Sequence, residues 1–299
     1  MSQLRVLTAS KVGNLRSILV FKRFSKVRSL TILTRSRRAK SGRNNRGVIT
    51  SCGRGSGSRR NFRRLIINYK FFRDIQKKHQ TLLCYHTSIL MTHSGKITLV
   101  VKVTSFEHDP NRNAVVVLLY YVSKSKMYML APYSIKCGQS IVFGCLVARS
   151  LGSIRPIYFL PSGSIVHSLE LKEGKGGQIA RAGGTFVKLL IKIKNYITVT
   201  MPSKEIRLIS RECYATLGQV DTIMVGSVTI GKAGRSRWNG KRPQVRGSAQ
   251  NPNDHPHGGG EGKCPVGRKH PVTPWGKCAL GKKTRSKRKK RSELILLRF

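Results

Sequence analysis

Acidic residues are scarce in this chain. Only 11 of its 299 residues are Asp or Glu, against 58 Lys or Arg, which gives a formal net charge of +47. Residues 1–64 hold 18 cations and no acid, and residues 232–299 hold 19 cations against three acids. Self-repulsion on this scale opposes compaction of both ends unless a polyanion neutralises them. Solvated basic faces explain short charge runs but not two whole termini, so we predict a nucleic-acid partner bound through its phosphates.

Long apolar runs and paired cysteines are also missing. No run approaches the roughly 18 residues of a membrane span, and the basic C-terminal block lacks the apolar face of a membrane-surface helix. The seven cysteines are scattered without a Cys-x-x-Cys pair, so we expect reduced thiols in an intracellular compartment. A zinc site remains an alternative, although His255, His257, Cys264, His270 and Cys278 match no compact zinc-binding spacing.

The centre of the chain is typical of β structure. Residues 96–104 and 113–122 are rich in β-branched and aromatic residues, and the turn formers of 109–113 predict a hairpin with a basic tip. Residues 126–130 and 140–143 continue the pattern at the spacing of a small barrel.

A second group of short strands is predicted at 165–171, 196–201, 206–209 and 222–226, whereas residues 180–192 are expected to be partly helical. We therefore predict a mainly β protein with two small antiparallel domains between two long basic extensions. The predicted segments are a basic N-terminal extension (1–64), a first barrel (65–160, with an insertion at about 66–95), a second barrel (161–235) and a Gly-rich basic C-terminal extension (236–299).

The segment from Arg246 to Gly262 has no apolar periodicity and contains five glycines. Pro252 and Pro256 stiffen its path, and the three consecutive glycines at 258–260 allow another backbone to approach closely. Such a segment is suited to lie against a large polar partner.

Several motifs in this order carry a family resemblance. They are Gly42-Arg-Asn-Asn-Arg-Gly-Val-Ile-Thr50, Asp109-Pro-Asn-Arg-Asn113, Gly174-Lys-Gly-Gly-Gln-Ile-Ala-Arg-Ala-Gly183, Glu205-Ile-Arg-Leu-Ile-Ser210, Gly240-Lys-Arg-Pro-Gln-Val-Arg-Gly247, the Asn251–Gly262 segment, Arg268-Lys-His-Pro-Val-Thr-Pro-Trp-Gly276 and Gly281-Lys-Lys-Thr-Arg285. On these motifs the chain resembles the universal large-subunit ribosomal protein two family, of the bacterial and organellar type, over roughly residues 42–299. The resemblance implies an OB-type barrel followed by an SH3-like barrel, with both tails buried in large-subunit ribosomal RNA (rRNA).

The departures from the family pattern point to an organellar member. Where the family usually has His-Arg-Gly-Gly-Gly-His-Lys-Arg, residues 52–60 read Cys-Gly-Arg-Gly-Ser-Gly-Ser-Arg-Arg, and the first 40 residues match nothing in the family. Residues 1–46 have the composition of a mitochondrial transit peptide, and equally that of a tail threaded through RNA. A mitochondrial ribosome is the first expectation and a plastid ribosome the second.

The resemblance implies a structural constituent of the large ribosomal subunit and not an enzyme. The expected partners are large-subunit rRNA, other large-subunit proteins and the small subunit, in support of subunit association and of the peptidyl transferase region. No cofactor is expected beyond Mg²⁺ shared with rRNA, for which Asp254 and Glu261 are candidates. The alternatives are a free nucleic-acid chaperone and a zinc-dependent nucleic-acid enzyme.

The expected RNA-binding residues are cations, glycines, imidazoles and indoles in these motifs. They are Arg43, Asn44, Arg46, Arg54, Arg59, Arg60, Arg63, Arg64, Arg112, Lys175, Arg181, Arg235, Arg237, Trp238, Lys241, Arg242, Arg246, His255, His257, Gly258, Gly259, Gly260, Lys263, Arg268, Lys269, Trp275, Lys282, Lys283 and Arg285. The tryptophans suit stacking on an unpaired base, with a role as core anchors as the alternative. The histidines alternatively suit general acid–base catalysis, although no nucleophile or cofactor motif accompanies them.

Overall fold

The computed structural model describes residues 3–7, 17–21, 24–25, 29–37, 39–66, 89–91, 97–120, 126–144, 150–282 and 293–298. The chain forms two compact units. The barrel unit comprises residues 1–37, 60–232 and 293–299, and the extension unit comprises residues 38–59 and 233–292. Most of the insertion expected at about 66–95 lies outside the described residues.

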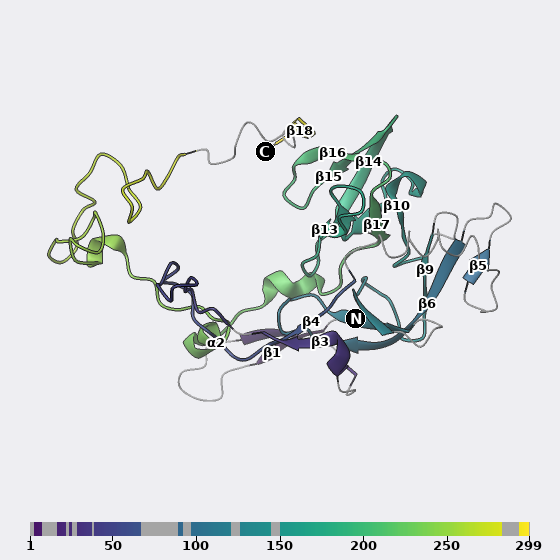
Figure 1. The fold of residues 1–299 in the computed structure, drawn as a ribbon, viewed down its shortest axis with the longest axis horizontal. Helices are drawn as coiled ribbons and strands as arrows, with labels where there is room; N and C mark the ends of the chain where they lie inside the picture. The colour runs from purple at the N-terminus through teal and green to yellow at the C-terminus, as the bar shows by residue number, and fades with distance from the viewer. Residues whose placement is uncertain are drawn as a thin grey trace. The chain divides into compact units, whose positions relative to one another are not determined.

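The first barrel contains the predicted hairpin and the two strands that follow it (Figure 1). Its sheet has the antiparallel order β9-β6-β7-β8, and β5 (Ile89–Met91) pairs with β6. The strands are β6 (Ile97–Glu107), β7 (Val116–Tyr120), β8 (Lys126–Leu130) and β9 (Ser140–Phe143). A register shift between Val103 and Ser105 marks an irregularity in β6, of the kind that bends a strand in a small barrel.

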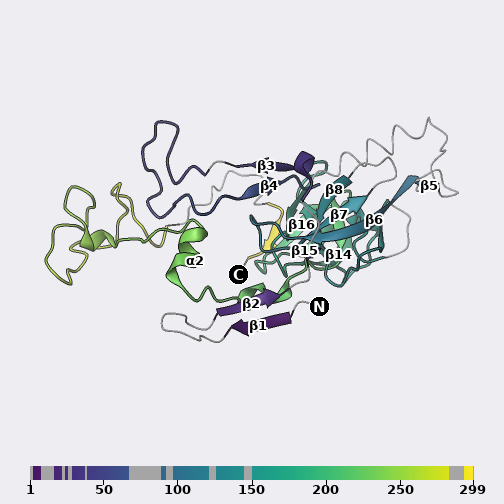
Figure 2. The ribbon, with the colours of Figure 1, turned by 90° about the horizontal axis from the view of Figure 1, so that it is seen from below.

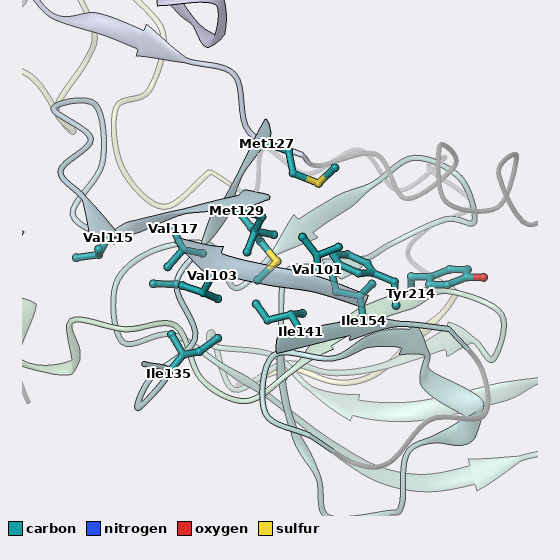
Figure 3. Packing of buried hydrophobic residues seen from close by; sticks show 13 residues of the cluster. Val101, Val103, Val115, Val117, Met127, Met129, Ile135, Ile141, Ile154 and Tyr214 are labelled. Carbon is teal, nitrogen blue, oxygen red and sulfur yellow. The ribbon is translucent and has the colours of Figure 1, made fainter. Parts of the chain in front are cut away.

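The core of the first barrel is mainly aliphatic and also contains methionine and aromatic side chains, as Figure 3 shows. Val101, Val117, Leu119 and Ile141 are each at most 1% exposed. Alternate residues of β6 therefore point inward, which is the pattern expected of a strand with one buried face.

The second barrel is built from short strands around a separate core of thirteen buried residues from Ile157 to Ala215. Its strands are β11 (Ile165–His167), β12 (Leu169–Glu170), β13 (Gly177–Ile179), β14 (Val187–Ile193), β15 (Tyr196–Thr200), β16 (Ile206–Ser210) and β17 (Tyr214–Leu217). Strand β10 (Ile154–Pro156) joins the two barrels, because it pairs with β9 in parallel and with β17 in antiparallel fashion. The predicted mainly β fold, with an OB-type barrel followed by an SH3-like barrel, is confirmed.

Two local predictions are wrong. Residues 187–193 form strand β14 and not part of a helix, because Gly184 has φ +71° and the following Val-Lys-Leu-Leu-Ile-Lys-Ile run pairs along β15. Residues 223–227 form a 3-10 turn, η3, and not a strand. Thr222 is left-handed at φ 68°, and its N–H is bound by the Asp221 carboxylate at 2.7 Å, so the extended backbone ends there.

The N-terminal extension contributes to the barrel unit. Strand β3 (Thr34–Ser36) pairs with β4 (Asn61–Arg63), as Figure 2 shows. Beside this pair, Leu30, Leu33 and Leu65 pack on Tyr128 and its neighbours in β7 and β8. Part of the basic N-terminal segment thus covers the outer face of the first barrel.

The remaining described elements are short. They are β1 (Gln3–Leu7), β2 (Ser17–Phe21), η1 (Thr31–Leu33), η2 (Ile157–Phe159), η3 (Ile223–Ser227), α2 (Ala233–Trp238), η4 (Gly247–Ala249) and β18 (Ile295–Leu297). Strand β18 pairs antiparallel with β16, so the chain returns to the edge of the second barrel. Among the described residues no helix is long and apolar enough to cross a membrane.

The second barrel also buries polar groups. Both carboxylate oxygens of Glu170 are bound by backbone, Oε1 by the N–H of Gly176 at 2.8 Å and Oε2 by the N–H of Tyr214 at 3.0 Å. Close by, His167 is fully buried and its Nδ1 lies 3.0 Å from the Ser168 hydroxyl. Burial lowers the pKa of His167 to about 3, so the ring is neutral in the folded protein at neutral pH.

We predict that His167 makes the protein sensitive to mild acid. Its pKa is lower in the folded state than the ordinary 6.5, so the unfolded chain takes up the proton first and stability falls as the pH drops through 6.5 towards 3. Between pH 7.5 and pH 5 the loss is about 2 kcal/mol for one such group. Urea unfolding at both pH values measures this loss.

His167→Leu removes the titrating group, so this variant is expected to lose about 2 kcal/mol less than the wild type between the two pH values. The matched control is His270→Gln, because His270 is exposed and its removal leaves the buried ring in place. Equal acid sensitivity in the wild type and His167→Leu contradicts the prediction.

Candidate nucleic-acid interface

The extension unit folds with almost no hydrophobic core. Over residues 39–59 and 233–282, Val272 is the sole buried hydrophobic side chain. Backbone hydrogen bonds in turns and loops hold this part of the chain together instead. A unit of this size without a core is marginal in water.

Two segments far apart in sequence are joined within this unit. Three backbone hydrogen bonds connect residues 53–58 to residues 238–242: Gly55 N–H to the Gly240 carbonyl at 2.8 Å, Ser58 N–H to the Trp238 carbonyl at 2.9 Å, and Arg242 N–H to the Gly53 carbonyl at 3.0 Å. Gly57 is left-handed at φ +66°, and a Cβ there would meet the Trp238 carbonyl at 2.6 Å. Glycine is therefore required at this position.

The joined segments line an open pocket of about 490 Å³. Five of the predicted RNA-binding residues line it, and so do residues that the sequence did not single out. The predicted ones are Arg43, Arg237, Trp238, Lys241 and Arg242, and the additional ones are Ser41, Gly55, Ser56, Gly57 and Ser58. The pocket thus carries four cationic side chains and no acidic one, a combination suited to an anionic ligand.

The Arg246–Gly262 loop is shaped by its own backbone. His255 N–H binds the Asn251 carbonyl at 3.2 Å, and Gly259 N–H binds the Gln250 carbonyl at 3.1 Å. A Cβ on Gly258 would collide with the carbonyl oxygens of Gln250 and Asn251. The glycine at 258 is needed for the loop to close on itself, whatever its surface contacts.

The two histidines of this loop have structural partners. The Nε2 atom of His257 accepts the Val272 N–H at 2.9 Å, and its Nδ1 atom lies 3.0 Å from the Val266 carbonyl. Since Nε2 accepts, Nδ1 carries the proton and donates. The His255 ring stacks on His257 at 5.0 Å, and its Nδ1 accepts the His257 N–H at 3.1 Å. His257 therefore ties the loop to the following hairpin, and a role of either histidine in RNA contact stays a prediction.

The tryptophans are at the surface. Trp238 is 52% exposed and Trp275 is 77% exposed. Trp275 lies in the turn of a hairpin closed by Thr273 N–H to the Lys277 carbonyl at 2.7 Å and Ala279 N–H to the Pro271 carbonyl at 3.0 Å. Neither indole is buried in a hydrophobic core, and stacking of either on RNA stays a prediction.

Two predicted RNA-binding arginines already have partners inside the barrel unit. Arg63 contacts Glu107 at 3.2 Å, and Arg112 contacts Asp109 at 2.6 Å. Both carboxylates are buried, and Glu107 also accepts the Tyr128 hydroxyl at 2.9 Å. Burial and this hydrogen bond raise the pKa of Tyr128, so its hydroxyl remains a donor. The Arg63–Glu107 pair joins residues 44 positions apart, so sequence alone gave no signal of it, whereas Asp109 and Arg112 lie three residues apart in one motif.

The other predicted cations lie mainly at the surface. Those classed as exposed are Arg43, Arg46, Arg54, Arg59, Arg64, Lys175, Arg237, Lys241, Arg242, Arg246, Lys263, Arg268, Lys269 and Lys282. Arg60, Arg181 and Arg235 are half-buried, Lys283 and Arg285 lie outside the described residues, and Gly260 is exposed. Asn44 uses its side-chain oxygen on the N–H groups of Arg46 and Val48, at 2.9 and 3.0 Å, and so orders its own turn.

A basic aromatic group on the second barrel was not predicted. Lys192 Nζ lies 5.4 Å from the centre of the Tyr158 ring, and the Arg211 guanidinium carbon lies 5.5 Å from it. Tyr158 is 48% exposed. These residues are far apart in sequence, so no local motif marks them.

Metal ligands do not gather in the described part of the chain: no group of three or more His, Cys, Asp or Glu side chains there is placed to hold a metal ion. Of the five candidates named from the sequence, His270 and Cys278 come together, with Nε2 and Sγ 3.0 Å apart. Cys264 instead contacts the Glu261 carbonyl at 2.7 Å, and His257 is bound to backbone.

Comparison with protein-family models gives two matches. Residues 91–143 match the RNA-binding N-terminal domain of ribosomal proteins L2. Residues 150–276 match the C-terminal domain of ribosomal proteins L2. The first match covers most of the first barrel, and the second covers the second barrel and much of the extension unit.

We predict that His257→Leu loosens the hairpin without unfolding the barrels. The substitution leaves the Val272 N–H and the Val266 carbonyl without their imidazole partner, at a cost of about 1–3 kcal/mol. Hydrogen–deuterium exchange of the rRNA-bound full chain should accelerate about tenfold in residues 266–273. Lys263→Gln, an exposed change in the same segment, serves as the control. Unchanged exchange in the His257→Leu variant contradicts a stabilising role for the contacts of His257 with Val266 and Val272.

Proposed function

Because this chain belongs to the ribosomal protein L2 family, with its RNA-binding structural role in the large ribosomal subunit, we propose that it serves in the ribosome of an organelle. There it binds large-subunit rRNA through the extension unit and the tails, and it supports both subunit association and the peptidyl transferase region. Its partners are rRNA, neighbouring large-subunit proteins and the small subunit. We assign it no catalytic residue.

The observation that carries the RNA-binding part is the composition of the extension unit. Its described residues have one buried hydrophobic side chain, Val272, and a surface dominated by Lys and Arg. Such a unit cannot offset its conformational entropy by burying apolar surface. Phosphate contacts and the counterions that they release supply the missing free energy.

The proposed place near the peptidyl transferase region concerns the Arg246–Gly262 loop. The first two of its consecutive glycines pack against the loop's own residues, and Asp254 and Glu261 are exposed on it. A pair of exposed carboxylates beside RNA suits hydrated Mg²⁺ that the rRNA also binds. His257 supplies rigidity to this loop through its backbone contacts, a role that calls for no proton transfer.

The organellar part of the proposal rests on the sequence. The acid-free N-terminal segment and the residues 52–60 that depart from the family motif support it. We propose a mitochondrial ribosome first and a plastid ribosome second. A free nucleic-acid chaperone and a zinc-dependent enzyme are the competing functions.

Sedimentation decides among these functions. We expect the endogenous chain to co-sediment with the large subunit in sucrose gradients of lysed mitochondria, at a salt concentration that keeps subunits intact. A plastid gradient is the parallel sample. A chain that remains at the top of both gradients and shows RNA-remodelling or hydrolytic activity supports the competing functions instead.

We also predict that the basic segment 282–291 binds the phosphate backbone. Its eight Lys and Arg residues are replaced by Gln, which leaves β18 in place. The slope of log affinity for rRNA against log salt should become shallower by several units, because each lost phosphate contact removes about 0.9. A variant with the same segment shuffled keeps the charge and should keep the slope. An unchanged slope in the Gln variant shows that this segment does not contact phosphates.

A further inference from the structure

We propose that the pocket between residues 41–58 and 237–242 receives a single unstacked nucleotide of the bound RNA. Its base lies on the indole of Trp238 and its phosphate lies among the cations. The proposal deepens the RNA-binding function above and rests on it. It assigns a ligand of defined size and chemistry to a site that is otherwise only one part of a basic surface.

The charge of the pocket selects for phosphate. Arg43, Arg237, Lys241 and Arg242 line it, and none of its ten lining residues is acidic. All four side chains are exposed, so their charged ends reach a ligand from several sides. The planar guanidinium groups suit bidentate contacts to phosphate oxygens, and the lysine adds a point charge.

The indole of Trp238 adds a flat apolar face to this anionic site. The residue is 52% exposed, and its backbone is fixed because its carbonyl accepts both the N–H and the hydroxyl of Ser58, at 2.9 and 3.3 Å. A tryptophan held at a defined place in a pocket but not buried in a core is suited to stack on a base. Phosphate binding alone makes no use of this indole.

The dimensions and the remaining lining residues fit one nucleotide. The volume of about 490 Å³ lies within the range of about 300–1,000 Å³ that is typical of small-ligand sites. The serines at 41 and 56 place hydroxyl groups in the lining, which can bond a ribose or a base edge. An acidic peptide satisfies the cations but not the indole, so the nucleotide is the favoured occupant.

Close backbone contacts hold the two walls of the pocket against each other. The Cβ of any residue at 57 would meet the Trp238 carbonyl at 2.6 Å and the Gly240 nitrogen at 2.9 Å. At Gly55 the same addition would come within 3.0 Å of the Arg242 side chain. The two glycines thus allow the N-terminal segment to form one wall of the pocket against the residues that carry the indole.

Tryptophan fluorescence of the full chain tests the proposal. In a Trp275→Phe background Trp238 is the sole tryptophan, because the chain has two. The probes are a single-stranded RNA decamer, a fully abasic decamer with the same sugar–phosphate backbone, and a poly-glutamate of equal charge. Each probe is titrated into this background and into the same background with Trp238→Leu, where binding is followed by a fluorescent label on the probe.

We expect the intact decamer to quench Trp238 and to bind about tenfold more tightly than the abasic one, since base stacking is worth about 1–3 kcal/mol. In the Trp238→Leu variant this advantage of the intact decamer should disappear. A further variant, Gly57→Val, should reduce the quenching while the barrels remain folded by circular dichroism.

Three outcomes overturn the proposal. One is equal affinity for the intact and abasic decamers in the background chain, and another is an advantage of the base that persists in Trp238→Leu. The third is equal quenching by poly-glutamate, which shows that the pocket binds anionic chains without regard to a base. If neither decamer binds to any variant, the RNA-binding function itself fails. Tight binding of the intact decamer without quenching of Trp238 is a distinct result, which contradicts the pocket proposal and leaves RNA binding intact.

Discussion

Buried carboxylates are the constraint on which the barrel unit depends. The chain has 11 acidic residues, and four of them, Glu107, Asp109, Glu170 and Asp221, are at most 5% exposed. Each buried carboxylate needs donors close by, since an unpaired buried charge costs several kcal/mol. The barrels supply backbone N–H groups to Glu170 and an arginine and a tyrosine to Glu107. Four of the few negative charges are thus held inside the barrels by donors that the fold supplies, and on the surface Lys and Arg far outnumber the remaining acids.

The two units consequently have different sources of stability. The barrel unit has two mainly aliphatic cores and needs no partner to bury them. The described part of the extension unit has a single buried hydrophobic side chain, and glycines and backbone hydrogen bonds determine its shape. We propose that folding of this unit is coupled to RNA binding, as is common for basic segments that bind nucleic acid. A scaffold that folds first and an RNA-dependent surface are combined in one chain.

Sequence patterns predicted the strands of the first barrel well because most of them have runs of β-branched and other apolar residues between turn formers. They failed at residues 187–193 and 222–226, where tertiary pairing and a left-handed Thr222 decide the structure. Composition singled out Arg237 and Trp238, which line the basic pocket, and their contact with RNA stays a prediction. The pairing of Arg63 with Glu107 and the tie made by His257 depend on residues 44 and 15 positions away. Local patterns contain no information on such contacts.

Strand β18 has a consequence for the order of events during synthesis. It completes the edge of the second barrel by pairing with β16, yet the ribosome makes Ile295 long after Ile206. At a synthesis rate of roughly 5–20 residues per second, the edge of β16 waits several seconds or more for its partner. An unpaired edge strand is a template for other strands, and during this interval the nascent barrel is most vulnerable to aggregation. A chaperone that covers this edge is of most use just before translation of the chain ends.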